Sequence, residues 1–441
     1  MVKRVFIFVA AVCALIGSFV LGTRMSSVEG QAKPGTGFAA IPGQVGGQDP
    51  FGPYDAAANW PKPISGLPGN EKWTWGSGEG IFAESPNRVF ILQRGELPNI
   101  PQPRVLALPQ LGPSIEFPIG RLPWRDATTA SPPRNLDLNA PCGGQGQPEC
   151  INAEVDTDGS GVNGRDFNWQ NCLVVVDANG NITETWKQYD KDYRRPHSVF
   201  INPYDATKAV WVVDDYRHAI FKYTNDGSKL LQTIGTVNHH ASDDTHFNRP
   251  TFMAWQPDSS FYVADGYNNT RVVKFDKDGK YLLAWGERGE PGGKEMRGGY
   301  FNTPHGVTVD QKTHEVFVND RNNHRIQVFD ANGKFLRQWS TGAPPSDVHL
   351  VYMGADEKVW IFDRGTSKMV QYDTQGHLLY AWGTWGAPDM PGAFWGVHGV
   401  SVDQDGNFYS AAVDSGGGQK FTPRPGANPA MMVGKPVKAA W

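Results

Sequence analysis

Short runs of β-branched and aromatic residues recur along most of this chain, and a polar turn closes each of them. Residues 303–340 hold one complete set, because HGVTV, EVFVND, RIQVFD and KFLRQWS read as four successive strands. Asn332 and Gly333, between the last two runs, form a pair that tolerates the positive φ of a tight hairpin. Four antiparallel strands in about forty residues make up one blade of a β-propeller.

The same unit recurs on both sides of residues 303–340, and each copy keeps the hairpin glycine. An earlier unit is split, since residues 80–95 supply its first two strands and residues 171–186 its last two. We therefore expect an all-β chain folded as a six-bladed β-propeller over residues 71–423. The other copies begin near residues 196, 250, 347 and 396.

The last copy has no obvious fourth strand after Phe421. Residues 71–76, EKWTWG, resemble the ends of two other copies, YLLAWG and LLYAWG. We therefore expect Lys72 to Trp75 to supply that strand, so that an N-terminal strand closes the ring and removes the exposed edges. Residues 424–441 would then be a C-terminal tail.

A Pro-rich insertion, residues 96–168, interrupts the first blade. Cys142 and Cys150 lie in it, where an exported chain is permitted a local disulfide, whereas Cys172 is expected to be a buried strand residue. The DTDGSG run at residues 156–161 matches the first half of a calcium loop. Phe167 stands where that loop needs a bidentate Glu, which favours a polar turn.

Charge and hydropathy change the picture at the N-terminus. Lys3 and Arg4 precede an apolar run, so residues 1–24 read as a signal peptide or a membrane anchor, followed by a linker over residues 25–70. We expect the rest of the chain to be exported, periplasmic or extracellular, with membrane contact only through such an anchor. The net charge of −4, without a basic patch, argues against a nucleic-acid partner.

Three copies open with a histidine in the same place, namely His197, His305 and His398. The first strand of each blade lines the central channel, and alternate blades of a six-bladed ring stand about 120° apart, so these imidazoles should converge on the axis. One such histidine would simply bond to water or a carbonyl, but three favour a metal. Three neutral histidines with a fourth position open are the pattern of a catalytic Zn²⁺ site. His349 could take the equivalent place in the fifth blade, as a fourth channel residue or a support for the ligands.

Polar residues also follow the second strand of several blades, near the mouth of the channel. They include Arg94, Tyr267, Arg321 and Arg364. A purely structural role could also explain these residues. An arginine in this place could form a salt bridge with the Asp that precedes it, and a tyrosine could lie on the rim of the channel. For Arg364 we expect that salt bridge.

With these residues in view, residues 72–423 resemble the lyase core of the peptide-amidating enzymes, peptidyl-α-hydroxyglycine α-amidating lyase. That family is a six-bladed propeller of NHL repeats with an axial three-histidine zinc. The resemblance implies that His197, His305 and His398 hold Zn²⁺ and that Tyr267, Arg94 and Arg321 are catalytic. It is carried by PHS and PHG at the first two histidines, ADGYNNTR around Tyr267, RG at Arg94 and NDRNNHRIQ at Arg321.

The same resemblance implies a structural Ca²⁺ near the axis. Gly399 stands where the family has an Asp ligand directly after its last zinc histidine. The other two contacts would be the main-chain carbonyls of Ile81 and Val199, which any residue offers.

The resemblance implies an enzyme that cleaves the C–N bond of a peptidyl-α-hydroxyglycine-like carbinolamide, giving an amide and glyoxylate. The substrate would be a small molecule or peptide with a terminal carboxylate, held by Arg94 or Arg321, while Tyr267 takes the hydroxyl proton. Two alternatives stay open: a non-catalytic exported NHL-repeat propeller that binds a partner, and another metal-dependent lyase or hydrolase on this scaffold. A sugar-lactonase-like propeller would need an acidic calcium site, and no matching carboxylates accompany the histidines.

Overall fold

The computed structural model describes residues 49–100, 163–290, 295–386 and 390–437, with residue 110 and the short strands 106–107 and 116–117. The N-terminal residues 1–48, the pair Cys142 and Cys150, and the run 156–161 lie outside these ranges. Within the described ranges, no helix is both long and apolar enough to cross a lipid bilayer.

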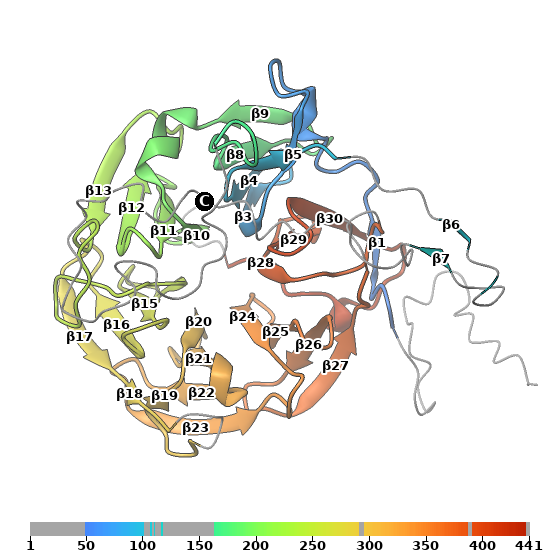
Figure 1. Cartoon of the computed structure of the whole chain (residues 1–441). Helices are drawn as coiled ribbons and strands as arrows, with labels where there is room; N and C mark the ends of the chain where they lie inside the picture. Colours follow the sequence, from blue (N-terminus) through green and yellow to red (C-terminus); the bar gives the residue numbers. More distant parts are fainter. Residues whose placement is uncertain are drawn as a thin grey trace, which may run out of the picture.

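Six four-stranded antiparallel sheets stand around a central axis, which confirms the predicted six-bladed propeller (Figure 1). Blades 2 to 5 each take four consecutive strands from the chain, with the first strand nearest the axis (Figure 1). Their bounds are β10 (Pro196–Ile201), β11 (Val210–Asp214), β12 (Ala219–Tyr223) and β13 (Leu230–Ile234); β14 (Met253–Trp255), β15 (Phe261–Asp265), β16 (Arg271–Phe275) and β17 (Tyr281–Trp285); β20 (Pro304–Val309), β21 (Val316–Asp320), β22 (Arg325–Phe329) and β23 (Phe335–Ser340); and β24 (Val348–Met353), β25 (Val359–Asp363), β26 (Lys368–Tyr372) and β27 (Leu378–Trp382).

Blade 1 is interrupted between its second and third strands, as the sequence indicated. Its strands are β3 (Gly78–Ser85), β4 (Arg88–Gln93), β8 (Leu173–Val176) and β9 (Ile182–Thr185). The remaining short elements are β6 (Leu106–Ala107), β7 (Glu116–Phe117), β18 (Glu287–Arg288), β19 (Tyr300–Phe301), η1 (Ile64–Gly66), η6 (Lys187–Asp192), η7 (Arg321–Asn323) and η8 (Pro429–Met431).

Blade 6 is closed by a different N-terminal strand from the one predicted. β1 (Tyr54–Ala56) pairs antiparallel with β30 (Gly418–Pro423), outside β29 (Phe408–Ala412) and β28 (Val397–Val402). The prediction that Lys72 to Trp75 closes the ring is wrong, because β2 (Trp73–Trp75) pairs with β5 (Glu96–Pro98) at the base of the insertion.

Tyr54 explains why the earlier segment closes the ring. Its ring is fully buried and lies 5.5 Å from the ring of Trp382 and 5.8 Å from that of Phe408. Its hydroxyl accepts a hydrogen bond of 2.9 Å from the backbone of Val433, so the C-terminal segment packs over the same closure. Part of the predicted linker therefore belongs to the propeller.

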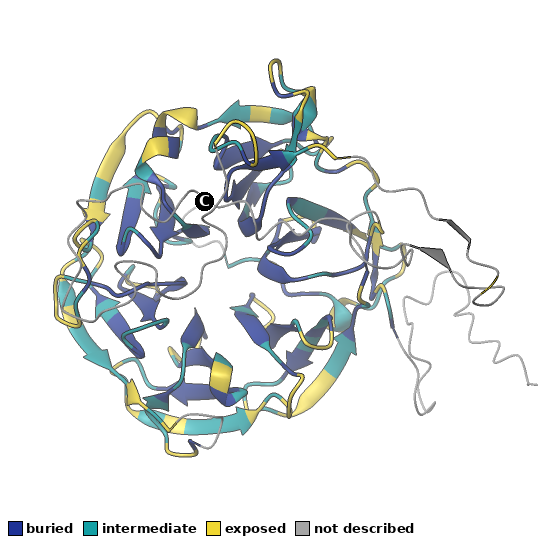
Figure 2. Cartoon of the chain, viewed as in Figure 1, coloured by how far each residue is buried: buried dark blue, intermediate teal, exposed yellow. Residues whose placement is uncertain are grey.

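Burial falls from the axis to the rim (Figure 2). The second strands of blades 2 to 6 are buried at every position, whereas the outermost strands β13, β23 and β27 are largely exposed or half-buried. Each inner sheet is covered by the blades on both sides, so its strands are apolar on both faces.

A contact between neighbouring blades explains the recurring hairpin glycine and Trp-Gly ending. Gly376 turns with φ +89°, and a Cβ there would lie 2.5 Å from the indole of Trp339 in the preceding blade. Gly333 meets Trp285 of its preceding blade in the same way, at 2.6 Å. The repeat signature is therefore an interblade contact as well as a turn.

We expect Gly376→Ala to lower the free energy of unfolding by about 2–4 kcal/mol, because it adds overpacking against Trp339 to the cost of a positive φ. Gly69→Ala is the matched control, since Gly69 has φ +84° and nothing within 4 Å of its added Cβ. That variant should lose only about 1–2 kcal/mol. Urea unfolding followed by tryptophan fluorescence measures both, and equal losses would contradict the interblade contact.

Candidate metal centre

A β-bulge in the inner strand turns one side chain of each even-numbered blade toward the axis. The pairing of β10 with β11 passes from Pro196 to Ser198 and leaves out His197. The pairing of β20 with β21 leaves out His305, and that of β28 with β29 leaves out His398. A bulged residue is re-aimed relative to its strand, so the repeat presents three histidines from equivalent points.

The structure brings these three imidazoles together. Their ring centroids lie 4.6 Å apart for His197 and His398, 5.0 Å for His197 and His305, and 5.2 Å for His305 and His398. One ring nitrogen of each lies within 4.8 Å of the others, a spacing that can hold a metal ion. Burial lowers the pKa of all three well below its ordinary value, which keeps the rings neutral and able to bind a cation.

The second nitrogen of each ring is held by a carbonyl of the following blade. A carbonyl can only accept a hydrogen bond, so Nδ1 carries the proton and the Nε2 lone pair is left for a ligand. The carbonyls come from the odd-numbered blades, so hydrogen-bond donors and acceptors alternate from blade to blade around the propeller. The Nδ1–O distances are 3.1 Å for His197 to Thr251, 2.6 Å for His305 to His349, and 2.7 Å for His398 to Glu79.

Tyr267 lies against the nitrogens that remain. Its hydroxyl is 3.2 Å from Nε2 of His197 and 3.0 Å from Nε2 of His305. The guanidinium of Arg249 lies 4.5 Å from the centre of its ring. Burial raises the pKa of the Tyr267 phenol, whereas Arg321 is the largest of the nearby charges that oppose this rise. The phenol oxygen is therefore next to any ion that the three histidines hold.

Phe252 bounds the triad on another side. The centroid of its ring lies 5.3 Å from that of His305 and 5.4 Å from those of His197 and His398. Phe252 also lines an apolar cavity of about 150 Å³ formed by the inner strands, which Tyr267 does not line. The ring of Phe252 thus contacts the three histidines on one side and the apolar cavity on the other.

The two predicted arginines are each paired with a carboxylate. Arg321 donates to Asp347 through Nε (2.8 Å) and Nη2 (3.2 Å), in the two-bond arrangement typical of arginine and a carboxylate. Arg94 lies with Nε 3.1 Å from Glu79 Oε1. Burial raises the pKa of Glu79 to about 7, and Arg94 is the strongest opposing influence.

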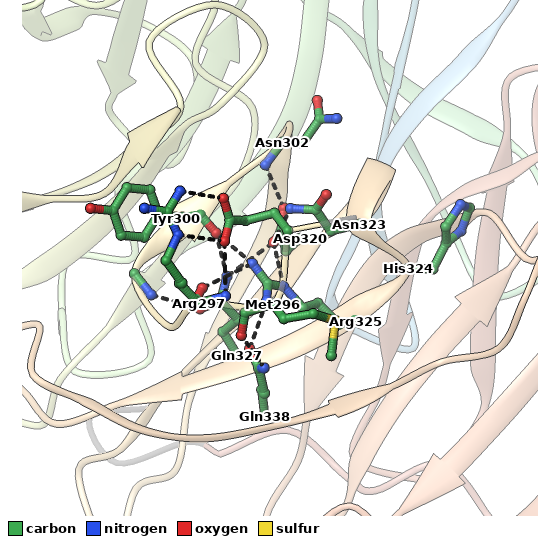
Figure 3. Close-up of polar contacts among 12 residues, drawn as sticks. Met296, Arg297, Tyr300, Asn302, Asp320, Asn323, His324, Arg325, Gln327 and Gln338 are labelled. Carbon is green, nitrogen blue, oxygen red and sulfur yellow. Dashed lines mark hydrogen bonds and ion pairs between the residues drawn. The ribbon is translucent and has the colours of Figure 1, made fainter. Parts of the chain in front are cut away.

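Asp320, which precedes Arg321, holds the surrounding backbone and side chains rather than that arginine, and Arg94 follows Gln93 instead of an Asp. Asp320 accepts hydrogen bonds from the backbone of Asn302 (2.7 Å) and from the side chains of Arg325 (2.8 Å) and Gln327 (2.9 Å) (Figure 3). The salt bridge expected for Arg364 has a different partner, since Arg364 pairs with Asp414 of the next blade through two bonds of 2.9 Å.

The calcium site that the resemblance implied does not fit this chain. The inner strands of blades 6 and 1 approach so closely that a Cβ on Gly399 would lie 3.0 Å from Gly80 Cα and 3.1 Å from the nitrogen of Ile81. No Asp side chain can replace Gly399 there without moving the backbone, so the carbonyls of Ile81 and Val199 lack their side-chain partner. Among the residues that the structure describes, the three histidines are the only group spaced for a metal.

Sequence reasoning placed His349 in the histidine position of the fifth blade without fixing its role, and it missed Glu79 and Asp347. Glu79 and His349 are also left out of pairing by bulges, in β3 and β24, and so occupy the histidine column of blades 1 and 5. Aligning the six copies on that column, Gly-Glu-Gly beside Pro-His-Ser, would have found Glu79 as well as His349. Asp347 gave no such signal, because it lies in the loop before β24.

The fold and the site define a six-bladed β-propeller that contains an NHL repeat, since residues 301–329 match the NHL repeat model. The chain is 36% identical over 172 residues to peptidyl-glycine alpha-amidating monooxygenase B of Xenopus laevis, a match over 38% of this chain and 19% of that protein. It is 30% identical over 173 residues to peptidyl-alpha-hydroxyglycine alpha-amidating lyase 1 of Drosophila melanogaster, over 38% of this chain and 31% of that protein.

NHL repeat-containing protein 3 of Mus musculus is 31% identical over 176 residues, over 38% of this chain and 48% of that protein. The matches therefore span less than half the length of these relatives. In sequence, the protein is similar to one protein named as an amidating monooxygenase, to one named as an amidating lyase, and to one named only for its repeats.

We expect His305→Ala to lower the affinity for Zn²⁺ by roughly 100-fold or more, because it removes one of three nitrogen ligands. Calorimetric titration of the metal-free protein with Zn²⁺ measures this. His240→Ala is the control, since His240 is a buried histidine that lies beside His218 and outside the triad. An equal loss in both variants, or no loss in either, would contradict the assignment of the metal centre.

Proposed function

We propose that this protein is a zinc-dependent lyase that cleaves a peptidyl-α-hydroxyglycine-like carbinolamide into an amide and glyoxylate. The observation that carries the proposal is the contact of the Tyr267 hydroxyl with the Nε2 atoms of His197 and His305. A metal-ligand set, an adjacent phenol and nearby guanidinium groups are the parts that this reaction requires. The sequence relatives named for the lyase reaction support the same assignment.

His197, His305 and His398 would hold the ion through Nε2, and borderline-soft imidazole nitrogen suits Zn²⁺ better than Ca²⁺ or Mg²⁺. When bound, Zn²⁺ acts as a Lewis acid that lowers the pKa of the substrate hydroxyl. The carbonyl bonds at Nδ1 keep the three rings oriented, so little reorganisation is needed on binding.

Tyr267 is the proton acceptor in this proposal. A phenol with a pKa of about 10 is a weak base at neutral pH, so the neighbouring positive charges must favour its ionised form. Arg321 lies close enough to oppose the effect of burial on the pKa of Tyr267. The Tyr267 phenolate would take the hydroxyl proton, the O–H electron pair would form the C=O bond of glyoxylate as the C–N bond breaks, and Tyr267 would return the proton to the amide nitrogen.

An arginine would hold the substrate carboxylate. The side chain of Arg321 is 20% exposed and that of Arg94 only 6%, so Arg321 is the more accessible of the two. Its Asp347 partner fixes the guanidinium while other N–H groups remain to donate to a second carboxylate.

We extend the proposal to the location of the protein: the apolar run of residues 5–21 would direct the chain out of the cytoplasm.

A non-catalytic propeller that binds a partner is the second candidate, because one of the relatives carries the name of the NHL repeat alone. Another metal-dependent lyase or hydrolase is the third, since the scaffold does not fix the reaction. Bound metal without glyoxylate release would favour the third candidate, and protein that neither binds metal nor turns over substrate would favour the second.

We expect Tyr267→Phe to reduce glyoxylate release from α-hydroxyhippurate at least 100-fold while the zinc content stays unchanged, since the change removes only the proton acceptor. Tyr300→Phe, in the short strand β19 outside the channel, should retain full activity. A Tyr267→Phe protein with zinc bound and an unchanged kcat would refute the role of the phenol.

We expect Arg321→Ala to raise KM at least tenfold, because a substrate carboxylate loses two charge-assisted hydrogen bonds. Arg364→Ala is the control, since Arg364 lies in the equivalent loop of the next blade, is tied to Asp414, and is only 3.9 Å from Asp347, the partner of Arg321. Steady-state kinetics with purified variants measures both, and an unchanged KM for Arg321→Ala would leave Arg94 as the carboxylate ligand.

A further inference from the structure

His349 occupies in blade 5 the place that the axial histidines occupy in blades 2, 4 and 6. The pairing of β24 with β25 leaves out His349 through the same bulge. Its ring centroid lies 5.7 Å from that of His398 and 6.2 Å from that of His305, and only 3% of the residue is exposed. It therefore borders the metal centre without belonging to the three nitrogens spaced for one ion.

The two ring nitrogens of His349 have different surroundings. Nε2 lies 3.3 Å from Oδ2 of Asp347, the carboxylate that also holds Arg321. Neither ring nitrogen has a hydrogen-bond partner among the described residues, and Nε2 alone has this contact with a carboxylate. A buried polar atom without a partner costs about 1–3 kcal/mol, and such atoms in native proteins call for an explanation such as a missing ligand.

The carboxylate of Asp347 also favours one of the two tautomers of His349. An ionised carboxylate only accepts hydrogen bonds, so it favours the tautomer with hydrogen on Nε2 and leaves Nδ1 as an acceptor. The wall beside the metal centre thus offers one buried acceptor that is not yet used.

We propose that His349 is a substrate-positioning residue whose Nδ1 accepts a hydrogen bond from the N–H of the scissile carbinolamide. The inference rests on the proposed function, in which the metal and Tyr267 take the hydroxyl and an arginine takes the carboxylate. The amide N–H is the hydrogen-bond donor of the reacting unit that those groups leave unassigned. An acceptor at this place would fix the C–N bond beside the metal and select secondary carbinolamides over N-alkylated ones.

The test compares kcat/KM for α-hydroxyhippurate and for its N-methyl analogue, which lacks the N–H. Wild-type protein should prefer the N–H substrate at least tenfold, since the analogue leaves the buried acceptor unpaired. His349→Phe should reduce that preference to within threefold, chiefly by raising KM for the N–H substrate. His349→Asn should keep most of the preference, because its amide oxygen can replace Nδ1 as an acceptor.

Zinc content and thermal unfolding of each variant are measured alongside the kinetics. If His349→Phe does not fold, His349→Leu removes the same acceptor with a smaller side chain. A wild-type ratio near one, or an unchanged ratio in the folded Phe or Leu variant, overturns the inference and leaves the lyase function standing. Zinc-loaded wild-type protein that releases no glyoxylate overturns the proposed function, and the inference falls with it.

Discussion

Three hydrogen bonds between neighbouring blades determine the centre of this molecule. Each axial histidine donates Nδ1–H to the carbonyl of the bulged or equivalent residue in the next blade. These bonds join the ring of blades at the axis and point the three Nε2 lone pairs at one another. The same contacts that orient the candidate metal ligands therefore also join blade 2 to blade 3, blade 4 to blade 5, and blade 6 to blade 1.

Close packing of the inner strands makes those bonds possible. A Cβ on Gly399 would lie only 3.0 Å from Gly80 Cα, so the inner strands of blades 6 and 1 are close together where His398 bonds to the carbonyl of Glu79. The same closeness leaves little room for an Asp at this position unless the neighbouring backbone shifts. The metal centre is bordered by the ring of Phe252, which packs against all three histidines.

Two further polar side chains near the axis, Glu79 and His349, come from the odd-numbered blades. Glu79 and His349 stand on either side of His398, and each lies beside one member of an arginine–carboxylate pair. This arrangement gives the site a polar wall that the three-histidine pattern alone does not require. His349 differs from Glu79 in that its neutral ring can face an uncharged part of a substrate.

The propeller fold and the meeting of the three axial histidines could be predicted from the sequence, because the repeat determines both. Once the copies are aligned, His197, His305 and His398 must fall on alternate blades, and ring closure brings them together. The closing strand could not be predicted, because three residues carry little pattern and the burial of Tyr54 depends on Trp382 and Val433, far away in the chain.

The partners of the arginines were hidden for a similar reason. Arg321 and Arg364 pair with Asp347 and Asp414, which come from neighbouring blades rather than from the adjacent residue. Backbone carbonyls at Thr251, His349 and Glu79 give no signal at all, since every residue has one. Only the three-dimensional register of one blade against the next shows which carbonyl a histidine will meet.

The most direct test of the central claim is a crystal structure of the zinc-loaded protein with anomalous diffraction measured at the zinc edge. The account predicts one strong peak on the axis, about 2.0–2.1 Å from Nε2 of His197, His305 and His398, with each Nδ1 still bonded to its carbonyl. A peak elsewhere, ligation through Nδ1, or no ordered zinc at the axis would contradict it.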